Sequence, residues 1–535
     1  MPGPMAHQVQ PLDPRRLESL IGHERVTALV DAAASLRALL GGRRIVNVNS
    51  TATGGGVAEM LATLLGYARG IGLDATWLVI SGKPEFFAVT KRIHNGLYGS
   101  PGDGGELDRG AREIYEGTIA SNLERITRSV RRGDVVLVHD PQPAGLIAPL
   151  VGLGAKVIWR CHVGYDGRNE WTERAWAFMR PYVEAAHAHV FSRESFAPEW
   201  IDRKGLRAIP PSIDPFTPKN RPLEPDVVLA ILGSAGLVSR DGARADPRVQ
   251  RSALVVSAGG VPDRRIPLVV QVSRWDRMKD MTGVLHAFTR HVDPADAHLM
   301  LAGPAVSGVS DDPEGEVVWQ EAVAAWHELS PSRQARVHLA CVPMDDPTEN
   351  ALVINALQRH AAVVVQKSLA EGFGLTVAEA MWKTRPVVAS AVGGIVDQVI
   401  DGETGLLVAD PYDLESCGTA IGHLLRDRDD AERLAHGGRR HVEHRFLGDR
   451  TFSSTRSSSR ASCGERRISR FVTPRGCTPK PVGGYSGWLR ATTKHRIESV
   501  NARGPRMRFS YRLCEAKFAS EPTADPVATT HVPHR

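Results

Sequence analysis

Two glutamates, Glu371 and Glu379, stand eight residues apart just after a short run of valines. The valines predict a buried strand, and the spacing of apolar residues predicts a helix that begins near Thr376. Between strand and helix, Gly372 and Gly374 allow backbone amides to approach a ligand closely. Thr376 and Glu379 also fit a capping box, which is a structural alternative for Glu379. Glu371 has no such alternative, so this loop is the sharpest indication of a ligand site.

A second group of charged residues follows another predicted strand, at 268–272. It contains Arg274 and Lys279 within the sequence SRWDRMKD. Ligands of open α/β sheets lie beyond the carboxyl ends of strands, where these two cations could clamp a diphosphate. The alternative is a solvated charge cluster, which is the commoner meaning of a loop that mixes Arg, Asp and Lys.

A run of three glycines, residues 54–56, follows a predicted strand and opens a predicted helix. Amides at a helix N-terminus favour a phosphate, and glycine permits its close approach. The dinucleotide fingerprint GxGxxG is absent, which disfavours a nicotinamide cofactor. A plain turn between strand and helix is the alternative, so Gly55 and Gly56 alone indicate phosphate binding only weakly.

Two histidines also follow predicted strands of the first half: His139, which precedes Asp140, and His162. A single histidine is usually structural, yet both stand where the ligand crevice of an α/β sheet is expected. His187 and His189 lack such a position and are expected to be structural. No group of His, Cys and carboxylates has the spacing of metal ligands, so no metal is expected.

Helical segments alternate with short β-branched runs through the body of the chain. Strands are expected at 45–48, 75–80, 135–138 and 157–159, and again at 268–272, 298–301, 362–365 and 386–389. This alternation is typical of a parallel sheet with helices on both faces. Four prolines within residues 210–218 interrupt it and indicate a linker, and residues 235–262 are expected to be loop. The sequence therefore predicts two doubly wound α/β domains, 1–215 and 216–446, and a tail of residues 447–535.

The net charge of the whole chain is +6, a value that suggests an anionic partner such as nucleic acid. The last 89 residues hold 17 Lys and Arg against 6 Asp and Glu, so the first 446 hold 49 against 54. The positive excess therefore lies in a tail rich in Ser and Arg, and the body is slightly acidic. We expect no nucleic-acid partner, and we expect an unfolded tail because its composition offers no core.

Nothing in the sequence predicts a membrane protein or a disulfide scaffold. It has no run of 18 apolar residues, and no apolar signal core follows Met1. Six cysteines in 535 residues, without CxxC spacing in the body, are expected to be reduced. The expected location is the cytoplasm, and 42% hydrophobic residues exclude a wholly disordered chain.

The segment EGFGLTVAEAMW resembles the signature of the retaining glycosyltransferases of family four. Arg274 and Lys279 resemble that family's phosphate-binding pair, and DGETGLLV at 401–408 resembles the turn that follows. The stretches VHDPQP, WRCH, IPPSIDPFTPKN and AVGGIVDQVIDGETG are similar to those of its trehalose-forming members. The resemblance covers about residues 40–446. It implies the GT-B fold, in which two Rossmann-like domains face a cleft and the second binds most of the donor nucleotide.

The resemblance also assigns roles to residues. Glu379 would bind the ribose hydroxyls of a nucleotide sugar, and Glu371 would bind the transferred glucose near its 3-hydroxyl. Arg274 and Lys279 would hold the diphosphate and stabilise its charge as it leaves. The other assigned residues are His162 beside the glucose at the reaction centre, Gly55 and Gly56 at the phosphate, Gly372, Phe373 and Gly374 near the glucose, and His139, Asp140 and Gln142 in the acceptor pocket.

The implied reaction moves glucose from ADP-glucose or UDP-glucose to the anomeric hydroxyl of free glucose and forms α,α-trehalose with retention. In this family the leaving phosphate is thought to accept the acceptor's proton on the same face, and no metal or other cofactor is implied. The partners would be small-molecule substrates, and related enzymes often form homodimers. The alternatives are a trehalose phosphorylase of the same fold, another family-four sugar transferase, a non-catalytic sugar-nucleotide binder and, remotely, a nucleic-acid binder acting through the tail.

Members of this fold usually end in a helix that crosses back onto the first domain, and residues 439–446 resemble the start of that ending. The family-like pattern stops near Asp449, and the Ser- and Arg-rich sequence follows. This abrupt change motivates the hypothesis that the tail arises from a reading-frame shift. The other reading frames of the gene test it, because the hypothesis fails if none of them continues the helical pattern.

Overall fold

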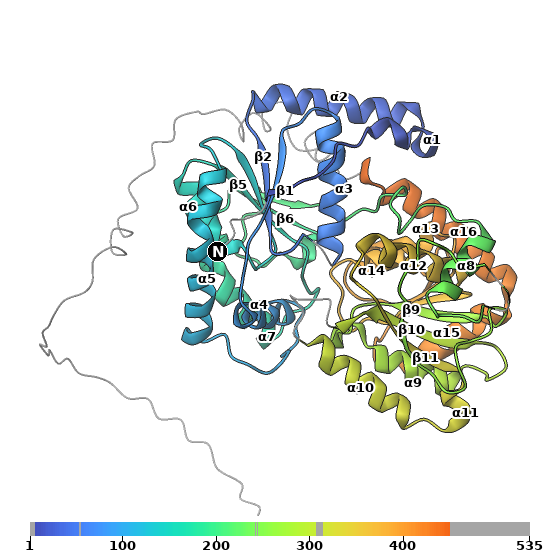
Figure 1. Cartoon of the computed structure of the whole chain (residues 1–535). Coiled ribbons are helices and arrows are strands. Elements are labelled where there is room, and N and C mark those ends of the chain that lie inside the picture. The colour runs from blue at the N-terminus through green and yellow to red at the C-terminus, as the bar shows by residue number, and fades with distance from the viewer. Residues whose placement is uncertain (1–5, 53–54, 241, 243, 307–313, 450–535) are drawn as a thin grey trace, which may run out of the picture. The chain divides into compact units, whose positions relative to one another are not determined.

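The computed structural model describes residues 6–52, 55–240, 242, 244–306 and 314–449, and these form two seven-stranded sheets with helices on both faces (Figure 1). The tail beyond residue 449, including the position of the proposed frame shift, lies outside the described residues. Among the helices of the described part, none is both long and apolar enough to cross a membrane.

The first sheet has the strand order β1-β3-β2-β4-β5-β6-β7, and only β1 is antiparallel to its neighbour. Its strands are β1 (Ala6–His7), β2 (Ile45–Asn49), β3 (Ala75–Val79), β4 (Val135–His139), β5 (Lys156–Cys161), β6 (Ala188–Phe191) and β7 (Leu206–Ala208). Its helices are η1 (Pro14–Leu17), α1 (Glu18–Ile21), α2 (His23–Leu40), α3 (Gly56–Gly70), α4 (Pro84–Leu97), α5 (Arg109–Ser129), η2 (Ala144–Leu146), α6 (Ile147–Gly152), α7 (Glu170–Val183) and η3 (Glu194–Phe196). Helices α4 to α7 pack on one face, and α2 and α3 pack on the other.

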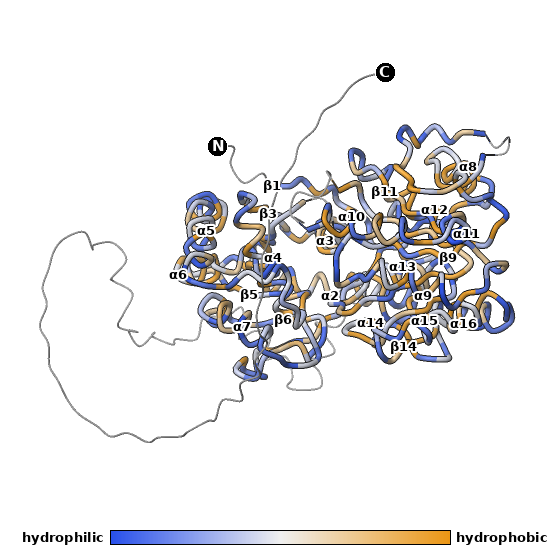
Figure 2. Tube along the Cα trace, turned by 90° about the horizontal axis from the view of Figure 1, so that it is seen from below, coloured by the Kyte–Doolittle hydropathy of each residue, from blue (hydrophilic) through white to orange (hydrophobic). Residues whose placement is uncertain are grey.

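The second sheet has the order β14-β13-β12-β9-β10-β11-β8, and only β8 is antiparallel. Its strands are β8 (Leu254–Val256), β9 (Leu268–Val272), β10 (His298–Pro304), β11 (Val337–Val342), β12 (Val363–Gln366), β13 (Val387–Ser390) and β14 (Leu406–Val408). Its helices are α8 (Pro225–Ser234), η4 (Arg277–Lys279), α9 (Met281–His291), α10 (Gly315–His327), α11 (Pro331–Gln334), α12 (Pro347–His360), α13 (Leu375–Trp382), α14 (Ile395–Gln398), α15 (Leu414–Arg426) and α16 (Arg428–Arg445). The chain is strongly hydrophobic through β9 and mostly hydrophilic through α16 (Figure 2).

The strand order reverses once in each sheet. In the first sheet β3 lies on one side of β2 and β4 on the other, and in the second β10 and β12 flank β9 in the same way. At such a switch point the connections leave the two central strands in opposite directions and open a crevice at their carboxyl ends. The fold therefore places two ligand crevices, one after β2 and β4 and one after β9 and β12.

The strands predicted from sequence are all present, with ends that shift by up to three residues. The prediction of loop for residues 235–262 is wrong at β8, which adds an antiparallel edge to β11. The three-residue strand Leu254–Val256 is too short to show a period, so only its pairing with β11 identifies it.

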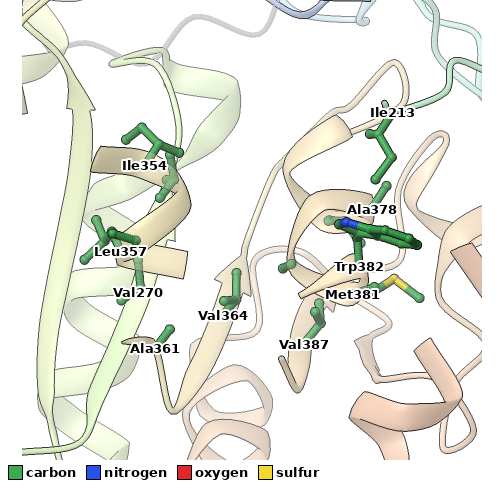
Figure 3. Close-up of a cluster of buried hydrophobic side chains, with 14 of the residues drawn as sticks. Ile213, Val270, Ile354, Leu357, Ala361, Val364, Ala378, Met381, Trp382 and Val387 are labelled. Atoms are coloured by element: carbon green, nitrogen blue, oxygen red, sulfur yellow. The ribbon is translucent and has the colours of Figure 1, made fainter. Parts of the chain in front are cut away.

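The proline-rich segment connects β7 to α8, and part of it is buried. Ile213 is only 5% exposed, and its N–H donates to the carbonyl of Phe446 at 2.9 Å. Ile213 and Leu447 also pair as an isolated parallel bridge. Figure 3 shows Ile213 pointing toward Ala378 in the core beside α13. This connection is therefore packed into the protein core.

The described chain ends against α2. Arg25 donates to Asp449 Oδ2 from Nε at 3.0 Å and from Nη2 at 2.7 Å, and to the carbonyl of Glu443 at 3.3 Å. The chain that leaves α16 thus contacts a helix of the first half.

A histidine pair, of which His338 is buried, joins β10 and β11. His338 is 1% exposed, with Nδ1 2.8 Å from Ser257 Oγ and Nε2 3.0 Å from His298 Nδ1. Burial, and then the charge of His298, lowers the pKa of His338 to about 3. The unfolded chain binds this proton near pH 6.5, so stability falls as the pH falls from about 6.5 toward 3.

We predict that wild-type protein loses about 2 kcal/mol more unfolding free energy between pH 7 and pH 5 than His338→Gln does. Urea denaturation at the two pH values measures the difference. His436→Gln, at an exposed position of α16, is the control and should match wild type. Equal losses in wild type and His338→Gln would contradict the prediction.

Candidate active site

The crevice of the second sheet brings together a cation and a carboxylate that the sequence singles out. Lys279 ends η4 after β9, and Glu371 lies in the loop between β12 and α13. Lys279 Nζ lies 2.5 Å from Glu371 Oε2, and Ser368 Oγ donates to the same oxygen at 3.2 Å. The crevice thus holds a paired Lys and Glu beside a glycine-bearing loop.

Asp276 connects the two cations of this crevice. Its Oδ2 lies 3.4 Å from Arg274 Nη2, and its Oδ1 accepts the N–H of Met278 at 2.8 Å, which caps η4 and so fixes the turn that carries Lys279. Burial raises the pKa of Asp276, but the charges of Lys91, Arg274 and Lys279 outweigh it and hold the pKa far below its usual range. Asp276 is therefore a buried anion shared by several cations.

In the first sheet, Asp140 orients His162. Asp140 Oδ1 accepts the backbone N–H of His162 at 2.7 Å, and Oδ2 lies 3.1 Å from His162 Nδ1. Asp140 has a φ of 64°, a left-handed conformation that places its carboxylate under the neighbouring strand end. Burial raises the pKa of Asp140, but the charge of His162 and the hydrogen bonds from it outweigh burial, so the pKa lies below its ordinary value.

The far nitrogen of His162 is available to a ligand. Nδ1 faces Asp140, whereas the buried Nε2 has no hydrogen-bond partner within the described chain. His139 stacks on His162 with ring centroids 5.6 Å apart, and its own Nε2 lies 2.9 Å from Asn47 Oδ1. Burial lowers the pKa of His139 well below its ordinary value, so it is neutral at pH 7.

The two crevices meet at Gly372. A Cβ atom on Gly372 would lie 2.2 Å from the carbonyl oxygen of His162 and 3.1 Å from the hydroxyl of Tyr98. A Cβ on Gly56 would lie 2.6 Å from Leu375 Cδ1, so the start of α3 also faces the start of α13. Glycine at 372 is therefore what lets the Glu371 loop reach the His162 loop.

Glu379 is buried and already has a cationic partner, Lys219. It is 2% exposed, and Lys219 Nζ lies 3.3 Å from its Oε1 and 3.0 Å from Glu59 Oε2. Burial raises the pKa of Glu379, and its buried Oε2 has no hydrogen-bond partner in the described part. The adjoining cavity, lined also by Glu59, Leu375 and Asn220, has a volume of about 30 Å³. That volume is enough for a water molecule.

The capping-box alternative for Glu379 is wrong. The N-cap of α13 is Gly374, with a φ of 85° and no side-chain cap, and Thr376 Oγ1 donates instead to Gln366 Oε1 at 2.8 Å. The side chain of Glu379 is thus not required to start the helix.

The remaining predicted residues have the following places. Gly55 is the exposed N-cap of α3 with a φ of 88°, and Gly54 lies outside the described residues. Phe373 is buried, and its ring packs on Phe446 at 5.4 Å, so only its backbone could meet a ligand. Gln142 is half-buried between β4 and η2.

Sequence reasoning missed the residues that join the two halves at the site: Lys91, Tyr98 and Lys219. Tyr98 follows α4 and lies edge-on to the ring of His94, with centroids 4.7 Å apart. All three contact residues more than 50 positions away in sequence. Within the described part, no group of three or more His, Cys, Asp or Glu residues is placed to hold a metal ion.

Comparison with known proteins identifies the family. Residues 47–198 match the family described as trehalose synthase, N-terminal domain, and residues 261–441 match group 1 glycosyl transferases. A trehalose synthase of Rubrobacter xylanophilus is 36% identical over 436 residues, which cover 81% of this chain and 92% of that protein. One from Pyrococcus horikoshii is 35% identical over 400 residues, covering 74% and 85%.

The chain belongs to the trehalose synthase family of group 1 glycosyltransferases. Its activity is therefore trehalose-related glycosyl transfer, and its substrates are small molecules. A trehalose phosphorylase of Grifola frondosa is also similar, with 26% identity over 430 residues that cover 74% of this chain and 54% of that protein.

Solved structures confirm the predicted GT-B fold of this trehalose synthase family member. A sucrose-phosphate synthase of Thermosynechococcus elongatus superposes with a TM-score of 0.54 at 18% identity, covering 78% of this chain and 99% of that one. An α,α-trehalose-phosphate synthase of Burkholderia vietnamiensis gives 0.56 at 14%, covering 78% and 98%.

We predict that Gly372→Ala lowers kcat for glycosyl transfer at least tenfold, because the added Cβ must push the Glu371 loop away from the His162 carbonyl. Gly117→Ala is the control, since a Cβ at that position in α5 meets nothing within 4 Å. Initial-rate assays of both variants test this. Wild-type turnover in Gly372→Ala would show that the contact does not matter.

Proposed function

We propose that the protein transfers glucose from ADP-glucose or UDP-glucose to the anomeric hydroxyl of glucose, forming α,α-trehalose with retention. The observation that carries this proposal is the meeting of the Arg274, Lys279 and Glu371 crevice with the Asp140 and His162 crevice at Gly372. One side supplies cations for a diphosphate, and the other supplies an oriented imidazole for a sugar. The family relationship supports the choice of trehalose as product.

The cations have partners that a diphosphate can replace. Lys279 pairs with Glu371, and Arg274 pairs with Asp276. When the diphosphate takes these cations, Glu371 is released to accept a hydrogen bond from a glucose hydroxyl. Charge-assisted bonds to a phosphate are strong in a site that excludes water, so the exchange favours the bound donor.

Retention then follows from attack on the face from which the diphosphate leaves. The bond from the sugar C1 to the phosphate oxygen breaks, and a bond from C1 to the acceptor oxygen forms on the same face. The acceptor's proton goes to the leaving phosphate oxygen. Arg274 and Lys279 stabilise the charge that develops on the diphosphate, and His162 Nε2 accepts a hydrogen bond from a sugar hydroxyl.

In this proposal the two cations take the place of a metal at the diphosphate. The chemistry therefore needs no cofactor besides the donor itself. A homodimer and a cytoplasmic location remain expectations from the resemblance and the sequence.

A trehalose phosphorylase is the second candidate, and one feature of the site favours it. Glu379, the expected ribose ligand, is already paired with Lys219 beside a cavity of about 30 Å³. A phosphorylase that uses inorganic phosphate does not need a ribose partner. It would still use Arg274, Lys279 and Glu371.

Product analysis separates these candidates. We predict trehalose from glucose plus ADP-glucose or UDP-glucose, and no glucose 1-phosphate from trehalose plus inorganic phosphate. Arg274→Ala and Glu371→Gln should each lower kcat/KM about 10²- to 10³-fold, because each removes a group that binds the transition state. Arg265→Ala, at an exposed ion pair with Asp263, is the control and should match wild type. No disaccharide with any donor would refute the main proposal, and glucose 1-phosphate formation would favour the phosphorylase.

A further inference from the structure

We propose that Lys91, a residue of the first half, is a positioning residue for the donor diphosphate. It acts through Asp276 and thereby sets the Arg274 side chain and the turn that carries Lys279. This inference rests on the proposed function, because it assumes that these two cations bind the diphosphate of a nucleotide sugar.

Lys91 makes its ion pairs outside its own half of the chain. It lies on α4 and is 9% exposed, with Nζ 2.8 Å from Asp276 Oδ2 and 3.0 Å from Glu314 Oε1. A lysine that is this deeply buried requires carboxylate partners, because burial removes the hydration of its ammonium group and an unpaired charge would be costly. Both of these carboxylates follow strands of the second sheet, Asp276 after β9 and Glu314 after β10. The contact therefore joins the two halves beside the donor crevice.

Asp276 makes three contacts at once. One oxygen caps the turn Arg277–Lys279 through the N–H of Met278, and the other lies between Lys91 and Arg274. Its distance to Lys91 is 2.8 Å, against 3.4 Å to Arg274. Lys91 is thus the closer of these two partners, and the pair with Arg274 is the looser one.

Because Asp276 pairs with both Lys91 and Arg274, Lys91 affects how easily Arg274 can leave Asp276 and bind a ligand. With Lys91 present, Asp276 has a cationic partner besides Arg274. A diphosphate can therefore bind Arg274 without leaving the Asp276 carboxylate buried and unpaired. Without Lys91, the charge of Asp276 would be balanced by Arg274, its ion-pair partner, and by the charge of Lys279, so Arg274 would be held more strongly. The diphosphate would then have to break a stronger pair, and its affinity would fall.

Lys91→Met tests the inference. The KM for the nucleotide glucose and the Kd for the free nucleoside diphosphate should each rise at least tenfold, while the KM for glucose stays within about twofold of wild type. Lys91→Arg should recover most of the loss. Lys83→Met, at an exposed position that caps the same helix, is the matched control. Calorimetric titration with ADP and UDP and initial rates at varied glucose give these values.

A double-mutant cycle with Asp276→Asn identifies the route of the effect. If Lys91 acts through Asp276, Lys91→Met should change the Kd less than about twofold in the Asp276→Asn background. Additive effects, or equal rises of both KM values, would overturn the proposal. If Lys91→Met does not fold, the double variant Lys91→Met/Asp276→Asn carries the test, because it leaves no unpaired Asp276 carboxylate. A Kd more than about twofold above that of Asp276→Asn alone overturns the proposal.

The two proposals fail in different ways. If wild-type protein forms no disaccharide, the proposed function is wrong. If wild-type protein transfers glucose and Lys91→Met binds the diphosphate normally, only the role of Lys91 is wrong.

Discussion

The structure depends on one steric constraint, the contact between the backbone at Gly372 and the carbonyl of His162. Each half of the chain forms a crevice at the reversal of its own sheet, and neither crevice contains a complete set of groups for sugar transfer. The cations proposed to bind the diphosphate lie in one, and the oriented imidazole lies in the other. Only a residue without Cβ lets the two loops approach closely enough to act on one bond. The contact thus turns two separate strand ends into a single site.

In the donor crevice, the carboxylates and cations of the protein pair with one another. Every carboxylate named in the donor crevice has a cation beside it, and each of these cations is one that a diphosphate could attract. Charges held in pairs inside a protein avoid the loss of hydration that isolated charges suffer. A ligand of high negative charge can replace these carboxylates, whereas a neutral sugar cannot. In the proposed function, this arrangement favours a phosphorylated donor through its charge, before any contact with the sugar.

The sequence predicted the parallel strands and the loops after them because both have local signatures. Valine runs followed by glycine or by charged residues mark β9 and β12, and these loops carry Arg274, Lys279 and Glu371. The partners of those residues could not be predicted. Lys91 lies 185 positions from Asp276, and Lys219 lies 160 positions from Glu379 and from Glu59 in opposite directions. A pairing across such distances leaves no pattern in a single sequence. For the same reason, the pairing of Glu379 with Lys219 could not be predicted from the sequence.

The paired connections at Ile213 and Leu447 limit how the halves can move. The chain passes between the halves twice, and the two passages are hydrogen-bonded side by side with Ile213 buried in the core. Pulling two segments joined in this way apart breaks the bond and exposes apolar surface to water. Rotation about this double connection keeps that bond and therefore costs less than a separation of the halves. A rotation of this kind would change the separation of the two crevices while Ile213 stays buried in the core.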